Sequence, residues 1–229
     1  ITSDFDGVIR AGNMGYTGTG TLPDIGADEG DFILVDVVGP RISYTPLVNT
    51  VSLTNTNLSN VSISDISNVE VSGGLKPRVY FKKKSQANTY NDNTNATDGW
   101  KYVEANGTTS PFDFDLDYAL LNGGSPMVGD TIQYFVIAQD MVMTPNVGFL
   151  AGLLTLTPVS VALDASHFPL TNSINAYVIK ASIEGIKTVC ASGCDYPTLT
   201  NTGGIFEAIN NAIVTDSLTI RIEGDLTVE

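Results

Sequence analysis

Carboxylates are the most abundant side chains that could do chemistry in this 229-residue chain, and one group of them lies among glycines near the N-terminus. This group consists of Asp4, Asp6, Asp24, Asp28 and Glu29. Calcium ions favour several carboxylate and carbonyl oxygens gathered by flexible loops, so these residues are candidate calcium ligands. The stretch DFDGVIR lacks the third acidic position and the distant glutamate of an EF-hand loop, and turn formation is the competing interpretation.

A second group of carboxylates alternates with apolar residues in FDFDLDY. The aspartates are Asp113, Asp115 and Asp117, and the apolar residues are Phe112, Phe114, Leu116 and Tyr118. This period of two predicts a strand with its apolar side chains on one face and its carboxylates on the other. We therefore expect a solvated face here and not a pair of catalytic acids.

The sequence contains few residues that could serve as an activated nucleophile or as zinc ligands. His167, in DASHFPL, is the only histidine, so histidine-dependent triads and histidine-rich zinc sites are disfavoured. Neither a GxSxG motif nor a P-loop is present. We expect His167 to be an ordinary loop residue without a partner, the chain not to be an enzyme, and no cofactor beyond a structural calcium ion.

The charge balance disfavours several classes of partner. There are 11 Lys and Arg residues against 25 Asp and Glu residues, which gives a formal net charge of -14. Nucleic acids and anionic membrane surfaces bind basic faces, so neither is an expected partner. No stretch approaches the ~20 apolar residues of a membrane span, which predicts no membrane insertion. The only basic run, Lys82-Lys83-Lys84, is expected to be the solvated end of a strand that leads into a loop at residues 85–98.

The elements that must position these residues are mostly strands. Apolar and polar alternation predicts strands at residues 31–37, 50–54, 77–83, 112–118, 131–140 and 176–183. The stretch TIQYFVIAQD (131–140) is apolar on both alternating sets, which is typical of a central strand covered on both faces. Turn signals separate the strands and no helical pattern intervenes, so an antiparallel sandwich over residues 31–180 is expected, with Trp100 in its core.

The C-terminal region shows a different pattern. Ile205, Ala208, Ile209 and Ala212 fall on one face of a short helix. Alternation then resumes in SLTIRIEGDLTVE, where a Gly224-Asp225 turn separates two short strands. Two short strands around a tight corner indicate the beginning of a coil and not a finished sheet.

Residues 187–229, KTVCASGCDYPTLTNTGGIFEAINNAIVTDSLTIRIEGDLTVE, resemble the beginning of right-handed parallel β-helix domains, including those of the pectin methylesterase type. Such domains begin with a strand of the form TV...G.DY.TL, followed by a short capping helix and the first coil. The helix would shield the apolar lumen and the backbone edge of that coil.

Two further resemblances concern the rest of the chain. DFDG followed by PDIGADEG is similar to the segment that closes β-helix domains in large secreted proteins of Bacteroidetes-type bacteria, and GPRISYTPL, PRVYFKKK and GDTIQYFVIAQD are similar to strands of the Ig-like sandwich that often follows. The resemblances imply an all-β chain, expected to be a segment of a longer protein. It would hold the end of one β-helix (1–30), an Ig-like sandwich (31–180), and the N-terminal cap and first coil of a second β-helix (181–229).

The family resemblance also implies a function. The chain would be a non-catalytic spacer of a cell-surface adhesin of a Gram-negative bacterium, exported by the type IX secretion system. Its partners would be the secretion translocon during export and cell-surface glycans or other surface proteins afterwards. The alternative is an accessory region of a β-helix polysaccharide lyase or esterase, whose catalytic aspartates would lie on coils beyond Glu229.

Cys190 and Cys194 are the only cysteines, with three residues between them. A zinc site would need two more ligands, and redox catalysis usually uses two intervening residues at a helix N-terminus. For an extracellular chain we expect a local disulfide that closes a tight loop, with free thiols as the alternative. So small a loop would contribute local rigidity and little global stability.

Overall fold

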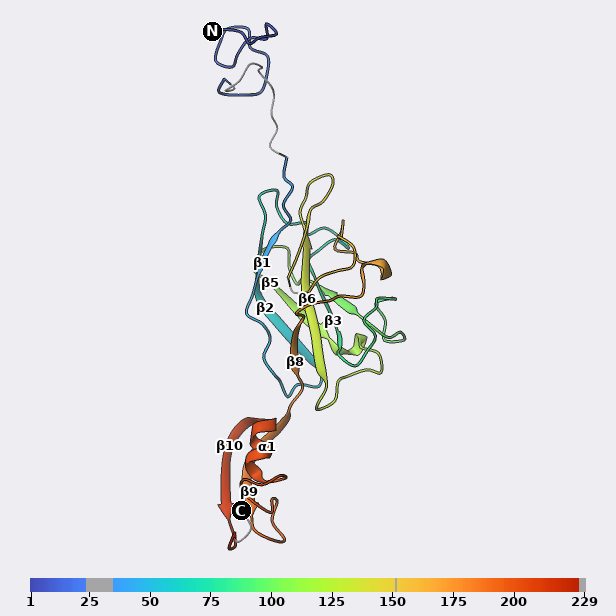
Figure 1. Cartoon of the computed structure of the whole chain (residues 1–229), viewed down its shortest axis with the longest axis vertical. Coiled ribbons are helices and arrows are strands. Elements are labelled where there is room, and N and C mark those ends of the chain that lie inside the picture. The colour runs from blue at the N-terminus through green and yellow to red at the C-terminus, as the bar shows by residue number, and fades with distance from the viewer. Residues whose placement is uncertain (24–34, 151, 227–229) are drawn as a thin grey trace. The chain divides into compact units, whose positions relative to one another are not determined.

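The computed structural model describes residues 1–23, 35–150 and 152–226, and these residues are mostly β, with one short α-helix. Contacts divide the chain into two compact units, Ile1–Val37 and Val38–Glu229. In the first unit an antiparallel bridge joins Ser3 to Ile9, and the methyl group of Ala11 is buried. The strands and helices named below belong to the second unit, and most of them are labelled in Figure 1.

Three antiparallel strands form the smaller sheet. They are β1 (Arg41–Ser43), β2 (Asn55–Ser64) and β5 (Phe112–Asp117), in the order β1-β2-β5. In β5 the apolar residues are buried and Asp113 and Asp115 are exposed, which confirms the alternation predicted for this strand. Tyr118 lies outside the strand, at the start of a 3₁₀ turn, η1 (Tyr118–Leu120), for which Asp117 is the N-cap.

Five antiparallel strands form the larger sheet. They are β3 (Arg78–Lys83), β4 (Lys101–Glu104), β6 (Thr131–Gln139), β7 (Val147–Leu150) and β8 (Asn175–Val178). The order is β4-β3-β6-β7, and β8 pairs with the first half of β6. Figure 1 shows β6 as the long strand through the middle of this sheet. Its central position confirms the prediction for residues 131–140.

One hydrophobic core lies between the two sheets. It combines residues of the smaller sheet, such as Val61 and Phe114, with residues of the larger sheet, such as Val79 and Val136. Burying a side chain of this size contributes about 1.5–3 kcal/mol of hydrophobic stabilisation. The hydroxyl groups of Tyr118 and Tyr177 lie 2.6 Å apart inside this core, so its buried polar atoms are also hydrogen-bonded.

A third layer, which the sequence analysis did not predict, covers the outer face of the larger sheet. The segment 152–174 follows β7 and buries Leu154, Val161, Leu163, Phe168 and Leu170 against Tyr80, Trp100, Phe135 and Ile137. The hydroxyl group of Tyr80 donates to the carbonyl of Val161 (2.9 Å) and accepts from the amide of Leu163 (3.0 Å). Trp100 is buried as predicted, but it lies in this outer core. Because both faces are covered, β6 is buried along nearly its whole length.

Three of the predicted strands differ from the structure. Residues 50–54 are not a strand, because the chain turns there and only Thr50 forms a bridge, with Ile179. Of residues 31–37, the first four lie outside the described residues and 35–37 have no strand pairing. Residues 176–183 do not form one strand, because β8 ends at Val178 and a new strand begins at Ala181.

The C-terminal residues form their own small cluster. They contain β9 (Ala181–Val189), α1 (Ile205–Asn211) and β10 (Ala212–Ile222). The helix predicted from the spacing of Ile205, Ala208 and Ile209 is confirmed, and Ala212 is its C-cap. β10 pairs with β9 in parallel, from Ala212 beside Ala181 to Ile222 beside Val189, with an irregularity between Val214 and Leu218.

Two glycines allow the backbone just before β1 to approach the backbone of β7 closely. A Cβ atom on Gly148 would overlap the carbonyl oxygen of Pro40, and one on Gly39 would overlap the backbone of Val147. Since backbone atoms cannot move aside as a flexible side chain can, neither position has room for a larger residue.

Gly148→Ala is expected to lower the free energy of unfolding by about 2 kcal/mol, because the added methyl group forces the backbone of Pro40 away from β7. Urea denaturation measures this change. Gly73→Ala is the matched control, since a Cβ atom at Gly73 meets nothing within 4 Å, and it should leave the stability nearly unchanged. Equal stabilities for the two variants would contradict the close approach.

Candidate functional site

The N-terminal carboxylates are described only in part. Asp4 Oδ1 accepts the amide of Val8 at 2.7 Å, and the backbone of Asp4 bonds Val8 and Gly7 in the same turn. Gly7 has a φ of 84°, which only glycine adopts easily. Asp6 is exposed, while Asp24, Asp28 and Glu29 lie outside the described residues. Turn formation therefore accounts for Asp4, and calcium binding by the five residues stays a prediction.

The carboxylates of β5 and its flank each accept hydrogen bonds from neighbouring groups. Asp113 accepts the amide of Asn60 at 2.9 Å. Asp115 accepts the side-chain amides of Asn57 (2.7 Å) and Asn106 (3.1 Å). These bonds tie β5 to β2 and to the loop before β5, so the carboxylates support the sheet.

His167 has a partner, contrary to the expectation from the sequence. Its Nδ1 lies 2.9 Å from Asp164 Oδ1, in a capping box around the 3₁₀ turn η2 (Ala165–His167). Hydrogen bonds from the hydroxyl and amide of Ser166 hold the pKa of Asp164 below its usual range, and the hydrogen bond with His167 adds a smaller effect in the same direction. Ser166 Oγ donates to Asp164 and not to His167, so the three side chains form a cap without the nucleophile-to-base bond of a catalytic triad.

The basic run is not a solvated strand end at its first residue. Lys82 is only 2% exposed, and its Nζ donates to the carbonyl oxygens of Lys83, Lys84 and Gln86, the last at 3.0 Å. The ammonium group also lies 5.5 Å from the ring centroid of Trp100. Burial lowers the pKa of Lys82. The prediction failed because the start of the loop at 85–98 folds back over the Lys82 ammonium group and supplies it with carbonyl oxygens.

A second buried lysine, which the sequence analysis missed, holds the loop at 85–98. Lys101 is fully buried, and its Nζ donates to the carbonyl oxygen of Asp92 (2.9 Å) and to Thr97 Oγ1 (2.8 Å). The carboxylate of Asp92 lies 3.6 Å from the same nitrogen. Burial lowers the pKa of Lys101, and the Asp92 charge opposes that change.

The Asp92 carboxylate is itself fixed by the loop. Hydrogen bonds from Thr97 Oγ1 (2.7 Å) and from the hydroxyl and amide of Thr94 (2.8 and 2.9 Å) lower the pKa of Asp92 to about 2. The signal in the sequence is a lysine directly after the buried Trp100, preceded by a run of Asn, Thr and Asp that can supply the oxygens.

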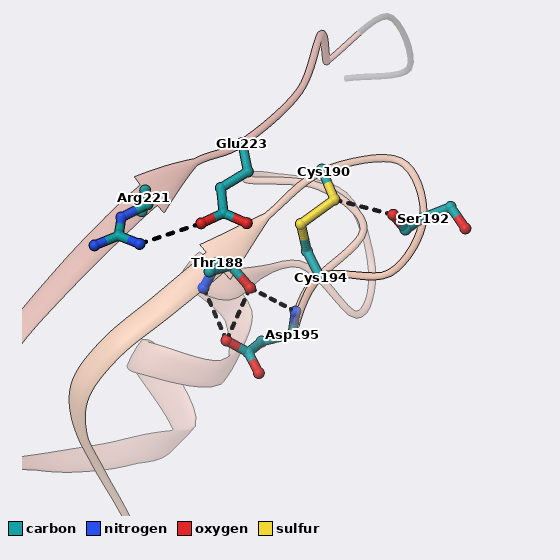
Figure 2. The surroundings of a disulfide bond; sticks show 7 residues. All are labelled: Thr188, Cys190, Ser192, Cys194, Asp195, Arg221 and Glu223. Carbon is teal, nitrogen blue, oxygen red and sulfur yellow. Dashed lines mark hydrogen bonds and ion pairs between the residues drawn. A yellow bond between two sulfur atoms is a disulfide. The ribbon is translucent and has the colours of Figure 1, made fainter.

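Cys190 and Cys194 form a disulfide, with Cα atoms 5.5 Å apart, in the connection between β9 and α1. Figure 2 shows that Thr188 and Asp195 lie beside it. Asp195 Oδ2 accepts the amide (2.8 Å) and the hydroxyl (3.0 Å) of Thr188, and the amide of Asp195 donates to Thr188 Oγ1 (3.0 Å). These bonds lower the pKa of Asp195. The same loop is therefore closed by the disulfide between Cys190 and Cys194 and by the hydrogen bonds between Thr188 and Asp195.

The loop is also held against the strands around it. Val189 forms a parallel bridge with Tyr196, and the amide of Glu223 donates to the carbonyl of Val189 at 3.0 Å. Glu223 in turn pairs with Arg221 at 3.3 Å, as Figure 2 shows. The arrangement can fix the path of the chain between β9 and α1. Both sulfur atoms are in the disulfide, so neither is available as a thiolate nucleophile or metal ligand.

Within residues 38–150 and 152–226, the sequence-predicted residues are not brought together in one site. The N-terminal turn, the β5 carboxylates, the η2 cap and the disulfide loop each form local hydrogen bonds. Among residues 1–23, 35–150 and 152–226, no helix has the length and apolar character needed to cross a membrane.

Comparison of the chain with known proteins found no matching family model, no matching curated protein and no matching solved structure.

Lys101→Met is expected to lower the free energy of unfolding by about 2 kcal/mol, because it keeps the apolar stem but leaves buried oxygens of the loop without a donor. Lys84→Met, at an exposed position, is the matched control and should change stability by less than about 0.5 kcal/mol. Urea denaturation of both variants decides the matter. A Lys101→Met variant as stable as the wild type would show that the loop does not depend on the ammonium group.

The Asp92 carboxylate is expected to contribute a pH-dependent part of the stability. Its pKa is lower in the folded chain than in the unfolded chain, so its contribution is present above about pH 4 and is lost as the pH falls toward about 2. Urea midpoints of the wild type and of Asp92→Asn should therefore converge across this interval. A difference that stays constant between pH 6 and pH 2 would contradict the assignment.

The disulfide is expected to act locally. Intact-mass measurement after alkylation without reduction should show no added alkyl group, and two should appear after reduction. Because only three residues separate the cysteines, reduction should leave the main thermal transition nearly unchanged while amide exchange accelerates at residues 188–196. A large fall in the main transition would show that the bridge carries global stability.

Proposed function

We propose that this chain is a non-catalytic spacer segment of a large secreted cell-surface adhesin. In this proposal an Ig-like sandwich (31–180) joins the end of one right-handed parallel β-helix (1–30) to the cap and first coil of another (181–229). The type IX secretion translocon exports the protein, and the β-helix surfaces contact glycans or other proteins at the cell surface.

The parallel pairing of β9 and β10 is the observation that supports this proposal most. Parallel strands need a crossover connection, and here the connection contains the disulfide loop and α1. Ile183 of β9 and Ile205 of α1 are buried in one small cluster, against which Leu218 and Ile220 of β10 pack. A parallel strand pair with a short helix across its apolar side is the arrangement with which a solenoid can begin.

The hydrogen bonds of aspartates and buried lysines in residues 38–180 are consistent with a structural role. The aspartates at residues 113, 115, 117 and 164 accept hydrogen bonds from neighbouring amide or hydroxyl groups, and the buried lysines donate to loop oxygens. Polysaccharide hydrolysis needs two cooperating ionisable groups at a fixed separation in a groove. These four aspartates are engaged in local turns and strand contacts instead, which favours a spacer over the enzyme alternative.

Replacement of the domain within the protein that carries it tests the spacer role. Deletion of residues 38–180 should reduce surface adhesion, and an unrelated β-domain with similar spacing between its ends should restore it, because a spacer contributes distance and not recognition. Surface exposure of each variant must be verified by antibody labelling. If the replacement is exported and folded but adhesion is not restored, the segment contributes recognition or chemistry of its own.

Polysaccharide turnover by the full chain is the complementary readout. We expect no reducing ends and no unsaturated products from pectin or alginate, with or without calcium. Turnover that is lost on substitution of Asp113, Asp115 or Asp117 would replace the spacer proposal with the enzyme alternative.

A further inference from the structure

The connection between β1 and β2 runs beside the last strand of the larger sheet. Thr50 forms a parallel bridge with Ile179, in which the amide of Thr50 donates to the carbonyl of Val178 (3.1 Å) and the amide of Lys180 donates to the carbonyl of Thr50 (2.7 Å). The beginning and the end of the two-sheet domain are therefore bonded directly to each other.

Side chains extend this contact back along the connection. Asn49 Oδ1 accepts the amide of Val178 at 2.8 Å, and the side-chain amide of Asn175 donates to the hydroxyl of Tyr44 at 2.7 Å. The amide of Leu47 donates to the hydroxyl of Tyr134 of β6, also at 2.7 Å. Tyr44 and Leu47 are half-buried against the core between the sheets, so the connection is held by packing as well as by hydrogen bonds.

The other edge of β8 is anchored in the sheet. Its residues pair with Thr131 to Tyr134 of β6, and just beyond its end the backbone of Ile179 exchanges two 2.8 Å hydrogen bonds with Gly129 and Asp130. A load on the end of β8 is therefore passed into β6, which is buried along nearly its whole length. The connection 44–50 is the part that must slide if the domain is to open from its ends.

We propose that residues 44–50 and β8 form a mechanical latch that keeps the domain folded when it is pulled through its two ends. The chain enters the domain before residue 44 and leaves it after residue 178. Because the two segments are parallel, tension pulls them along their length in opposite directions and loads their bonds together. Antiparallel segments that leave from the same end would instead be peeled apart one bond at a time.

The latch is a property of residues 38–180 alone and does not depend on the identity of the flanking regions. It goes beyond the spacer role, because a spacer need only maintain a distance, whereas the latch withstands a load. Failure of the domain replacement would not affect it, and absence of the latch would leave the spacer role untouched.

Single-molecule pulling of the full chain in two directions tests the latch. In the first geometry both termini are attached. In the second, the N-terminus and a handle on Ser173→Cys are attached, at an exposed position just before β8, so that the same bonds are peeled in turn. The pairing of β1 with β2 is loaded in both geometries, and the difference between them reports the latch.

At equal force, we expect the folded domain to survive about tenfold longer when it is pulled through its termini than when it is pulled through Ser173→Cys. This factor corresponds to roughly one additional backbone hydrogen bond that must break at the same time as the others. Equal lifetimes in the two directions, or a longer lifetime in the second, would overturn the proposal. Because both measurements use essentially the native sequence, neither depends on a destabilised variant.

Thr50→Pro identifies the bond that bears the load. It removes the amide that donates to Val178 and should shorten the lifetime at fixed end-to-end force about fivefold, while the lifetime in the Ser173 geometry changes less. Thr54→Pro, at an exposed position of the same connection, is the matched control and should behave as the wild type. A folded Thr50→Pro chain with the wild-type lifetime would show that the load passes elsewhere; if this variant does not fold, the comparison of pulling directions decides.

Discussion

The burial of β6 on both faces is the constraint on which the rest of the domain depends. Its alternating residues send Tyr134 and Val136 into the core between the sheets and Phe135 and Ile137 into the outer core. A strand that is apolar on both faces is stable only between two covers. The smaller sheet provides one cover, and the segment 152–174 provides the other.

Several buried or half-buried polar side chains of the larger sheet and its loops form hydrogen bonds with the second cover. The segment 152–174 has little regular structure of its own, so its backbone is satisfied by side chains of the sheet, such as Gln139, which accepts the amide of Val161 at 2.9 Å. Asn88 in turn bonds both Trp100 and Leu170, and so joins the loop at 85–98 to the same layer. Lys82 and Lys101 can be buried because oxygen atoms of the loop at 85–98 accept hydrogen bonds from their ammonium groups.

The local sequence pattern predicted a strand or helix correctly where the alternation or spacing of apolar residues within that element matches its buried face. The alternation of residues 112–117, the apolar strand at 131–140 and the spacing of Ile205, Ala208 and Ile209 each identified the element that the structure contains. Pattern failed at residues 50–54, whose alternation looks like a strand although only Thr50 finds a partner, 129 residues further along the chain at Ile179. It also failed for Lys82 and Lys101 and for the Asp164 partner of His167, because their surroundings come from loop segments without a periodic signal. The fold class and most strands were therefore predictable, while the third layer and the polar contacts under it were not.

Residue-resolved amide hydrogen exchange tests most directly whether both covers are required. If both covers are required, the amides of residues 134–138 in β6 exchange only through global unfolding, with the free energy measured by urea denaturation. We also expect that the amides of Val161 and Leu163, which are bonded to Gln139 and Tyr80, exchange with the same free energy as β6. If Val161 and Leu163 exchange at a much lower free energy while β6 stays fully protected, the outer layer is dispensable and β6 does not require two covers.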